Sequence, residues 1–144
     1  MSKLTELGVD RILPVIAARS VVRWEPDRVG GHLERLRRVA RESAMQSRRA
    51  WLPEVMDPET LAELVSRHDP GTLALAEPGG DPPSLAHPTV LVGPEGGWTD
   101  EEVAMVACRI GLGDQILRVE TAAITLGALL GALRSGLLAA TRIE

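Results

Sequence analysis

The sequence predicts one α/β domain built on a mostly parallel sheet, with helices on both faces of the sheet. Short runs rich in Val, Ile, Leu and Ala alternate along the chain with segments of helical periodicity, an order typical of parallel βαβ units. The 144 residues are enough for one compact core but not comfortably for two. No long polar or low-complexity tract interrupts the pattern, so we treat residues 1–144 as one domain.

The first elements are predicted to be a short helix and a strand. Residues 1–7 form the last turns of a helix, and Gly8 is its left-handed cap. A helix of about seven residues is marginal alone, so we expect the sequence to begin partway through an element. Residues 9–22 are rich in Val and Ile and form a strand, with Pro14 at its edge or at a bend.

The clearest helix covers residues 32–49. Four apolar residues fall on one of its faces at helical spacing: Leu33, Leu36, Ala40 and Ala44. Six arginines fall within an arc of about 160° on the other side: Arg35, Arg37, Arg38, Arg41, Arg48 and Arg49. Only Glu34 and Glu42 are close enough in sequence to pair with them. Two interpretations stay open, a solvated helix face or a surface that binds RNA phosphates.

The middle of the chain is predicted to hold a helix between two extended segments. The first extended segment is residues 53–55. The helix covers residues 58–67, with Asp57 as its N-cap and a proline at its first position. Residues 72–78 then form a buried strand that ends near the carboxylate of Glu77.

Two strands and a helix follow. Residues 89–92 form a strand. Thr99 and Glu102 make a capping box, which starts a helix over residues 100–110. Residues 115–119 are predicted to be a further short strand.

The apolar run over residues 122–141 is predicted to be the last helix. It has nearly the length of a membrane span, and Gly127 and Gly131 form a pair of small residues at helical spacing. Arg134 interrupts the run and no basic flank follows it. We therefore expect a helix buried on all sides, partly against a second copy of the chain, and no membrane partner.

Composition limits the kinds of site that the chain can hold. Residues 1–50 carry eleven Lys and Arg against six Asp and Glu, whereas residues 51–144 carry five against fourteen, so a polyanion would meet one face only. The one cysteine, Cys108, is expected as a small buried hydrophobic side chain in a helix, and a lone cysteine fits a reducing, intracellular setting. The three histidines show no ligand spacing, so no metal site is expected.

The segment VGPEGGWTDEEV, residues 92–103, is the strongest sign of a ligand site. Ligands of open α/β sheets gather at the carboxyl ends of strands, and here a strand ends in Gly-Pro-Glu-Gly-Gly before a capped helix. No Lys-Ser/Thr follows the glycines and Glu95 would repel a phosphate, so this is not a phosphate loop. A zwitterionic ligand bonded to the main chain, such as S-adenosylmethionine, fits these residues. A turn that only lets strand and helix pack closely is the open alternative.

Four segments together resemble a known family: TELGVDRILPVIAARSVVRW (residues 5–24), ARESAMQSRRAWLPEV (40–55), VGPEGGWTDEEV (92–103) and ILRVETAAI (116–124). In this order they are similar to the bacterial 16S ribosomal RNA uridine-N3 methyltransferases of the SPOUT, or α/β-knot, class. The match spans almost the whole chain. It implies a C-terminal trefoil knot, S-adenosylmethionine as cofactor, a homodimer formed partly through the knot helix, and small-subunit ribosomal RNA as substrate in the cytoplasm.

The resemblance also implies roles for particular residues. Cofactor contacts would come from Leu75, Glu77, Gly93, Pro94, Glu95, Gly96, Gly97, Ile116, Leu117, Arg118 and Thr121. Arg118 and Glu120 would be the catalytic residues. A fixed guanidinium stabilises the charge that uracil carries once N3 loses its proton, and this is the role expected for Arg118. Glu120 would orient Arg118 or accept the proton, unless it only caps or pairs at the start of the last helix.

The sequence departs from the family at several points. The family usually has arginine at the position of Gln115 and threonine at that of Val119. An N-terminal RNA-binding barrel domain has no counterpart here, and the family's catalytic domain begins with a strand and a longer helix ahead of residue 5, so we expect a shortened domain. Three alternatives stay open: a weak or inactive module for cofactor binding and dimerisation, a methyltransferase of another RNA, or an RNA-binding scaffold that uses only the arginine helix.

Overall fold

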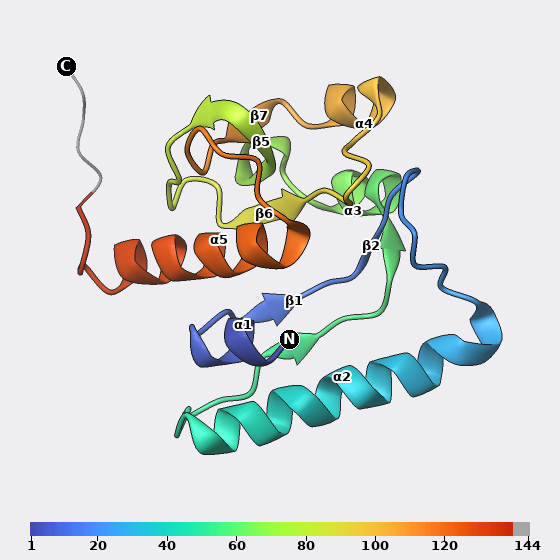
Figure 1. The fold of residues 1–144 in the computed structure, drawn as a ribbon, viewed down its shortest axis with the longest axis vertical. Helices are drawn as coiled ribbons and strands as arrows, with labels where there is room; N and C mark the ends of the chain where they lie inside the picture. The colour runs from blue at the N-terminus through green and yellow to red at the C-terminus, as the bar shows by residue number, and fades with distance from the viewer. Residues whose placement is uncertain (140–144) are drawn as a thin grey trace.

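The computed structural model describes residues 1–139, apart from the side chain of Pro26. Figure 1 shows short strands and helices alternating along the chain. In chain order these elements are α1 (Ser2–Glu6), β1 (Arg11–Ile12), β2 (Val15–Ile16), α2 (Pro26–Gln46), β3 (Glu54–Val55), β4 (Glu59–Thr60), α3 (Leu61–Arg67), a 3-10 turn (Pro70–Thr72), β5 (Leu73–Asp81), β6 (Thr89–Val92), α4 (Asp100–Met105), β7 (Cys108–Ile110) and α5 (Val119–Arg134).

Every strand pair in the described residues is parallel. β5 lies between β6 and β7, while β1 pairs with β3 and β2 pairs with β4. Pro14 lies between β1 and β2, and proline bends a strand because its φ is restricted and it has no N–H. The predicted strand over residues 9–22 is therefore two short strands. The prediction of an α/β domain with a mostly parallel sheet is confirmed.

The three-stranded sheet is covered on both faces, because successive side chains of a strand point to opposite sides. One face packs against α3 and the region of α4 through a buried cluster of Leu61, Leu64, Leu73, Leu75, Leu91, Trp98 and Val106. On the other face, Ala74 packs with Ile110 and with Leu126 of α5. Helices therefore lie on both faces, as predicted.

α2 and β3, with the start of the chain, form a second packing unit. The helix lies along β3 (Figure 1) and buries Leu33 and Ala40 against Val55. Leu33, Ala40 and Ala44 are each at most 4% exposed, so the predicted apolar face of this helix is confirmed.

Both ends of α2 differ from the prediction. The helix begins at Pro26 rather than at residue 32, because the fixed φ and missing N–H of proline suit the first turn of a helix. It ends at Gln46, and Arg48 follows with a φ of +54°. Arg48 and Arg49 thus lie beyond the helix, and their predicted place on its arginine face is wrong.

Arg49 turns into the protein. Its side chain is 8% exposed, and Nη1 donates hydrogen bonds to the carbonyl oxygens of Thr5 (2.9 Å) and Val9 (3.1 Å). Arg49 Nη2 lies 3.8 Å from the carboxylate of Asp10, which also pairs with Arg134 at the end of α5. This cluster joins the chain after α2 to α1 and α5.

We predict that Arg49→Ala lowers the free energy of unfolding by about 2–3 kcal/mol, because two carbonyl groups lose a charged donor in a region that excludes water. Chemical denaturation measures the change. Arg48→Ala is the matched control, because it removes an adjacent exposed arginine and should change the free energy by less than about 0.5 kcal/mol. Equal losses in the two variants would contradict the structural role of Arg49.

Helix α3 begins later than predicted. Its N-cap is Thr60 and not Asp57: the Thr60 hydroxyl accepts the N–H of Glu63, and the Glu63 carboxylate accepts the N–H of Thr60. Hydrogen bonds from the backbone and hydroxyl of Thr60 lower the pKa of Glu63. Just before the helix, β4 pairs with β2, and this pairing delays the helix start.

The chain after β6 differs most from the prediction. The capping box of Thr99 and Glu102 is confirmed, but α4 is short and β7 follows it, paired with β5. Cys108 therefore lies partly exposed in a strand instead of buried in a helix. Residues 115–119, predicted as a strand, form a loop and the first residue of α5. A short apolar run can form either a helix or a strand, and it forms a strand where a neighbouring strand is available to pair with it.

α5 confirms the predicted last helix but not its bounds: it begins at Val119 rather than at residue 122 and ends at Arg134. Residues 135–139 are not helical, because Gly136, with a φ of +73°, ends the helix.

Gly127 and Gly131 leave room for the chain at the end of α1. A Cβ atom at Gly127 would lie 3.5 Å from Leu7 Cδ1, and one at Gly131 would lie 3.2 Å from the Leu7 carbonyl oxygen. Ile124 is 37% exposed, so α5 is not buried on all sides within one chain. The last two residues of the predicted helix lie outside the described residues. None of the helices within residues 1–139 combines the length and the hydropathy that a membrane span requires.

Candidate functional site

The carboxyl ends of β5, β6 and β7 lie at one edge of the sheet, which we call the carboxyl edge, because the three strands are parallel. Residues 93–98, the glycine loop, follow β6, and residues 111–118 follow β7. Parallel strands lie about 4.8 Å apart, so these loops start about 10 Å apart, on either side of β5. The second loop leads to α5, which begins beside the end of β6 (Figure 1). Ligands of α/β proteins gather at such an edge.

Packing within the protein requires the glycines of the glycine loop. A Cβ atom at Gly93 would lie 2.9 Å from Trp98 Nε1, and one at Gly96 would lie 3.1 Å from Arg19 Cβ. The Gly97 N–H closes a turn by donating a hydrogen bond of 2.8 Å to the Pro94 carbonyl oxygen. Gly97 also has a φ of +69°, which favours glycine. The space that Gly93 and Gly96 leave is therefore filled by side chains of the protein itself, Trp98 and Arg19.

Arg19 is the main long-range contact of the glycine loop. Its Nη1 donates hydrogen bonds to the carbonyl oxygens of Gly96 and Trp98, at 3.0 Å each. The positive charge of Arg19 also acts on Glu101 at the start of α4. The pKa of Glu101 is lowered by hydrogen bonds from its own backbone N–H and from the Thr99 hydroxyl, and by the charge of Arg19.

Glu102 makes a second contact between the same two regions. Glu102 is only 7% exposed. Its carboxylate accepts hydrogen bonds from the N–H groups of Ala18 and Thr99, at 2.8 Å each. Sequence reasoning found Glu102 only as a capping residue and did not find Arg19. No local pattern reveals partners separated by 77 and 84 residues.

Two features of the carboxyl edge bear on ligand binding. Trp98 Nε1 is buried and has no hydrogen-bond partner among the described residues, although buried donors normally have one. Beyond the ends of β5 and β7 there is a hollow of about 380 Å³. Its lining consists of Gly79, Gly80, Pro82, Pro83, Gly111, Leu112, Gly113, Asp114 and Leu129.

Two glycines bring the strands together at that hollow. A Cβ atom at Gly80 would lie 2.6 Å from the carbonyl carbon of Ile110, and one at Gly111 would lie 2.5 Å from the carbonyl oxygen of Gly80. The register between β5 and β7 shifts here, between Ala76 and Asp81. Glu77 lies within this irregular part of β5 and not at the end of the strand, where it was predicted, because pairing with β7 extends β5.

The proposed catalytic side chains are exposed around the start of α5. Arg118 is the N-cap residue, but its side chain makes no capping hydrogen bond. Glu120 and Thr121 lie exposed in the first turn, and Ile116 is 90% exposed. Leu75, by contrast, is fully buried, with β6 and β7 paired on its two sides, so no part of it reaches the surface. Among residues 1–139, no group of three or more His, Cys, Asp or Glu side chains is arranged to hold a metal ion.

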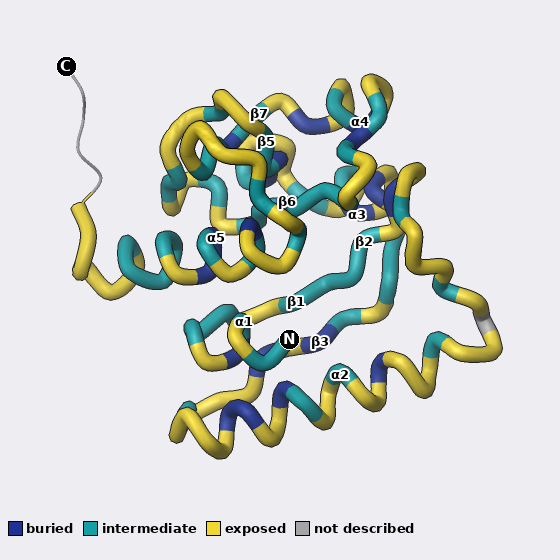
Figure 2. Tube along the Cα trace, viewed as in Figure 1, coloured by how far each residue is buried: buried dark blue, intermediate teal, exposed yellow. Residues whose placement is uncertain are grey.

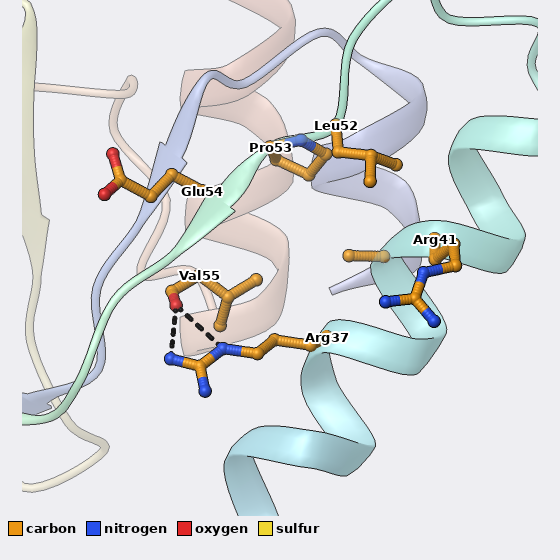
Figure 3. Close-up of a pocket in the computed structure, with 7 residues that line it drawn as sticks. Arg37, Arg41, Leu52, Pro53, Glu54 and Val55 are labelled. Carbon is orange, nitrogen blue, oxygen red and sulfur yellow. Dashed lines mark hydrogen bonds between the residues drawn. The ribbon is translucent and has the colours of Figure 1, made fainter.

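The six arginines predicted for RNA binding divide into two sets. Arg37 donates to the Val55 carbonyl oxygen from Nε (3.2 Å) and Nη2 (3.1 Å) (Figure 3). It also pairs with Asp57. Arg37 and Arg49 thus bind the protein itself. The other four are exposed and form no ion pair within the described residues: Arg35, Arg38, Arg41 and Arg48. Figure 2 shows that α2 is mostly exposed, with buried positions at intervals along it.

A second hollow, of about 390 Å³, lies beside α2. It is lined by Arg37, Ala40, Arg41, Leu52, Pro53, Glu54 and Val55 (Figure 3). α2 borders β3 rather than the three-stranded sheet (Figure 1). The structure therefore does not bring the exposed arginines of α2 to the carboxyl edge.

Together these features define a parallel α/β domain with a candidate ligand site in the loops after its strands. The RNA methyltransferase domain family matches residues 1–131, and the chain belongs to this family.

Relatives of known structure and sequence support the assignment. The ribosomal RNA small subunit methyltransferase E of Synechocystis sp. is 34% identical over 134 residues, covering 82% of this chain and 43% of that protein. Its Bacillus subtilis counterpart is 34% identical over 143 residues, covering 85% and 55%. The structure of ribosomal RNA small subunit methyltransferase E from Neisseria gonorrhoeae, bound to S-adenosyl methionine, matches with a TM-score of 0.80 and 30% identity, over 92% of this chain and 59% of that one. The chain spans about half the length of the curated relatives that it matches.

Proposed function

We propose that this domain transfers a methyl group from S-adenosylmethionine to N3 of a uridine in small-subunit ribosomal RNA. The observation that carries the proposal is that the glycine loop and the loop leading to α5 follow parallel strands at one sheet edge, in a chain of the RNA methyltransferase domain family. The names of the relatives support the substrate. The ligand in the related Neisseria gonorrhoeae structure supports the cofactor.

The carboxyl edge fits this cofactor. Main-chain groups of residues 93–97 and 116–118 would bind its polar groups, and Trp98 Nε1 offers a buried donor without a partner. The carboxylate of Glu77, which is half-buried, would favour a cationic ligand. When bound, S-adenosylmethionine supplies a methyl group on a positively charged sulfur.

Arg118 would stabilise the reacting base. Uracil N3 becomes nucleophilic once its proton leaves, and the charge then spreads onto the two neighbouring carbonyl oxygens. A guanidinium can donate to such oxygens without first breaking a bond of its own, and the Arg118 side chain makes no capping hydrogen bond. Glu120, in the first turn of α5, would accept the N3 proton or orient Arg118. The transfer itself then depends on positioning.

Homodimerisation and a trefoil knot belong to the same proposal. Four apolar residues in α5 and its flanks are exposed: Ile116, Ile124, Leu137 and Leu138. We propose that these side chains, along α5 and beyond its two ends, contact a second copy of the chain. We also propose that residues 111–118, which connect β7 to α5 beside β6, form the knotted loop, and that the enzyme acts in the cytoplasm, where ribosomal RNA would meet it.

The exposed arginines of α2 are proposed to bind RNA phosphates. We predict that the combined variant Arg35→Ala, Arg38→Ala and Arg41→Ala weakens RNA binding and reduces the slope of log affinity against log salt by about 2–3 units, because about 0.7–0.9 of a counterion is released per phosphate contact. Fluorescence anisotropy with a ribosomal RNA fragment measures this. Arg67→Ala is the control, since Arg67 is an exposed arginine already paired with Glu59. An unchanged slope would show that α2 is only a solvated face.

Two measurements test the proposed function. Calorimetry with S-adenosylhomocysteine tests cofactor binding, and labelled S-adenosylmethionine with unmodified small ribosomal subunits tests transfer, with the modified base identified by digestion and mass spectrometry. We expect binding and label at uridine N3. Absence of binding contradicts the proposal. Binding without transfer favours a cofactor-binding and dimerisation module, and label on another nucleotide favours a methyltransferase with a different RNA target.

A further inference from the structure

We propose that Arg19 is a positioning residue that holds the glycine loop in the conformation that receives the cofactor. The inference rests on the proposed function and adds a residue that lies far from the loop in sequence. It is a positioning residue, and not a catalytic one, because its contacts are with the loop itself.

The hydrogen bonds of Arg19 orient two peptide planes of the glycine loop. The carbonyl of Gly96 accepts from Arg19, and the N–H on the other side of that planar peptide, of Gly97, bonds within the loop. The carbonyl of Trp98 also accepts from Arg19, and the N–H of Thr99 across that peptide donates to Glu102. Both peptides are thus held from both sides.

The same arrangement leaves loop donors available. Within the described residues, the N–H groups of Glu95 and Gly96 donate no hydrogen bond, and both residues are exposed. With the next peptides held by Arg19, these N–H groups keep a constant arrangement. Donors whose directions are set in advance lose little entropy on binding a ligand.

The backbone that carries Arg19 is itself held in place. Ala17 is 7% exposed in the main core, and its N–H donates to the Ser20 hydroxyl at 3.2 Å. The Ser20 N–H donates back to the Ala17 carbonyl at 3.1 Å, and the Ala18 N–H donates to Glu102. This turn fixes the origin of the Arg19 side chain, so the side chain can hold the loop.

Arg19 itself is exposed, so its removal should act on the loop and not on global stability. We expect Arg19→Ala to speed hydrogen exchange of the bonded N–H groups of Gly97 and Thr99 about tenfold, the effect of losing hydrogen bonds to a charged donor, with an unchanged melting temperature. Arg19→Lys should give a partial effect. Arg23→Ala is the matched control, an exposed arginine four residues on that should leave exchange unchanged. Equal exchange in Arg19→Ala and wild type would overturn the inference.

Cofactor affinity gives the second readout. We expect the Kd for S-adenosylhomocysteine to rise about tenfold in Arg19→Ala and to remain at the wild-type value in Arg23→Ala. A faster-exchanging loop with unchanged Kd would also overturn the positioning role. If the wild-type protein binds no S-adenosylhomocysteine, the proposed function fails and the positioning role for that cofactor fails with it, whereas hydrogen exchange still decides whether Arg19 holds the loop.

Discussion

Replacing Arg118 with alanine is expected to lower the rate of methyl transfer to uridine by about 100- to 1,000-fold, the loss typical when a donor to a developing negative charge is removed. The fold should not change, because the Arg118 side chain is exposed and makes no capping hydrogen bond at the start of α5. Arg118→Lys keeps the charge but loses the two-point geometry of the guanidinium, so an intermediate rate is expected. Single-turnover assays with labelled S-adenosylmethionine measure all three proteins.

The control for Arg118 is the neighbouring Gln115→Ala, which changes an exposed polar residue of the same loop and should leave the rate near that of the wild type. Calorimetry with S-adenosylhomocysteine must show that Arg118→Ala still binds, so that the loss lies in the transfer step. A rate within a few-fold of wild type in Arg118→Ala would remove Arg118 from the proposed mechanism.

Replacing Gly80 with alanine is expected to lower the free energy of unfolding by about 3 kcal/mol, the upper end for an inserted methyl group. The added Cβ would lie 2.6–2.7 Å from main-chain atoms of Ile110 and Gly111. These atoms belong to β7 and the loop that follows it, so relief requires β5 and β7 to separate. The melting temperature should fall by about 10 °C, which differential scanning calorimetry measures.

Gly30→Ala is the matched control for Gly80. Gly30 lies inside α2 with open space at its Cβ position, so alanine should stabilise the protein by about 0.5–1 kcal/mol through its higher helix propensity. Opposite signs for the same chemical change would show that contact between β5 and β7, and not the loss of glycine, decides the effect. Stabilisation by Gly80→Ala would contradict the described approach of the strands.

Much of the fold follows from signals that act over a few residues. The left-handed positions of Gly8 and Gly97 and the capping box before α4 depend on neighbouring residues, and β6 appears as a short β-rich run. The apolar face of α2 repeats at helical spacing. These features could be predicted because their physical causes lie within one or two turns of chain.

The sequence by itself thus determined the α/β class, the apolar face of α2, and a glycine loop placed between β6 and α4. Only the tertiary structure decided that residues 108–110 pair with β5 as a strand, that Arg49 is buried, and that Trp98 and Arg19 occupy the space beside Gly93 and Gly96. The physical reason is the same in each case. Strand pairing, side-chain burial and long-range hydrogen bonds depend on partners brought close by the fold, which no local pattern contains.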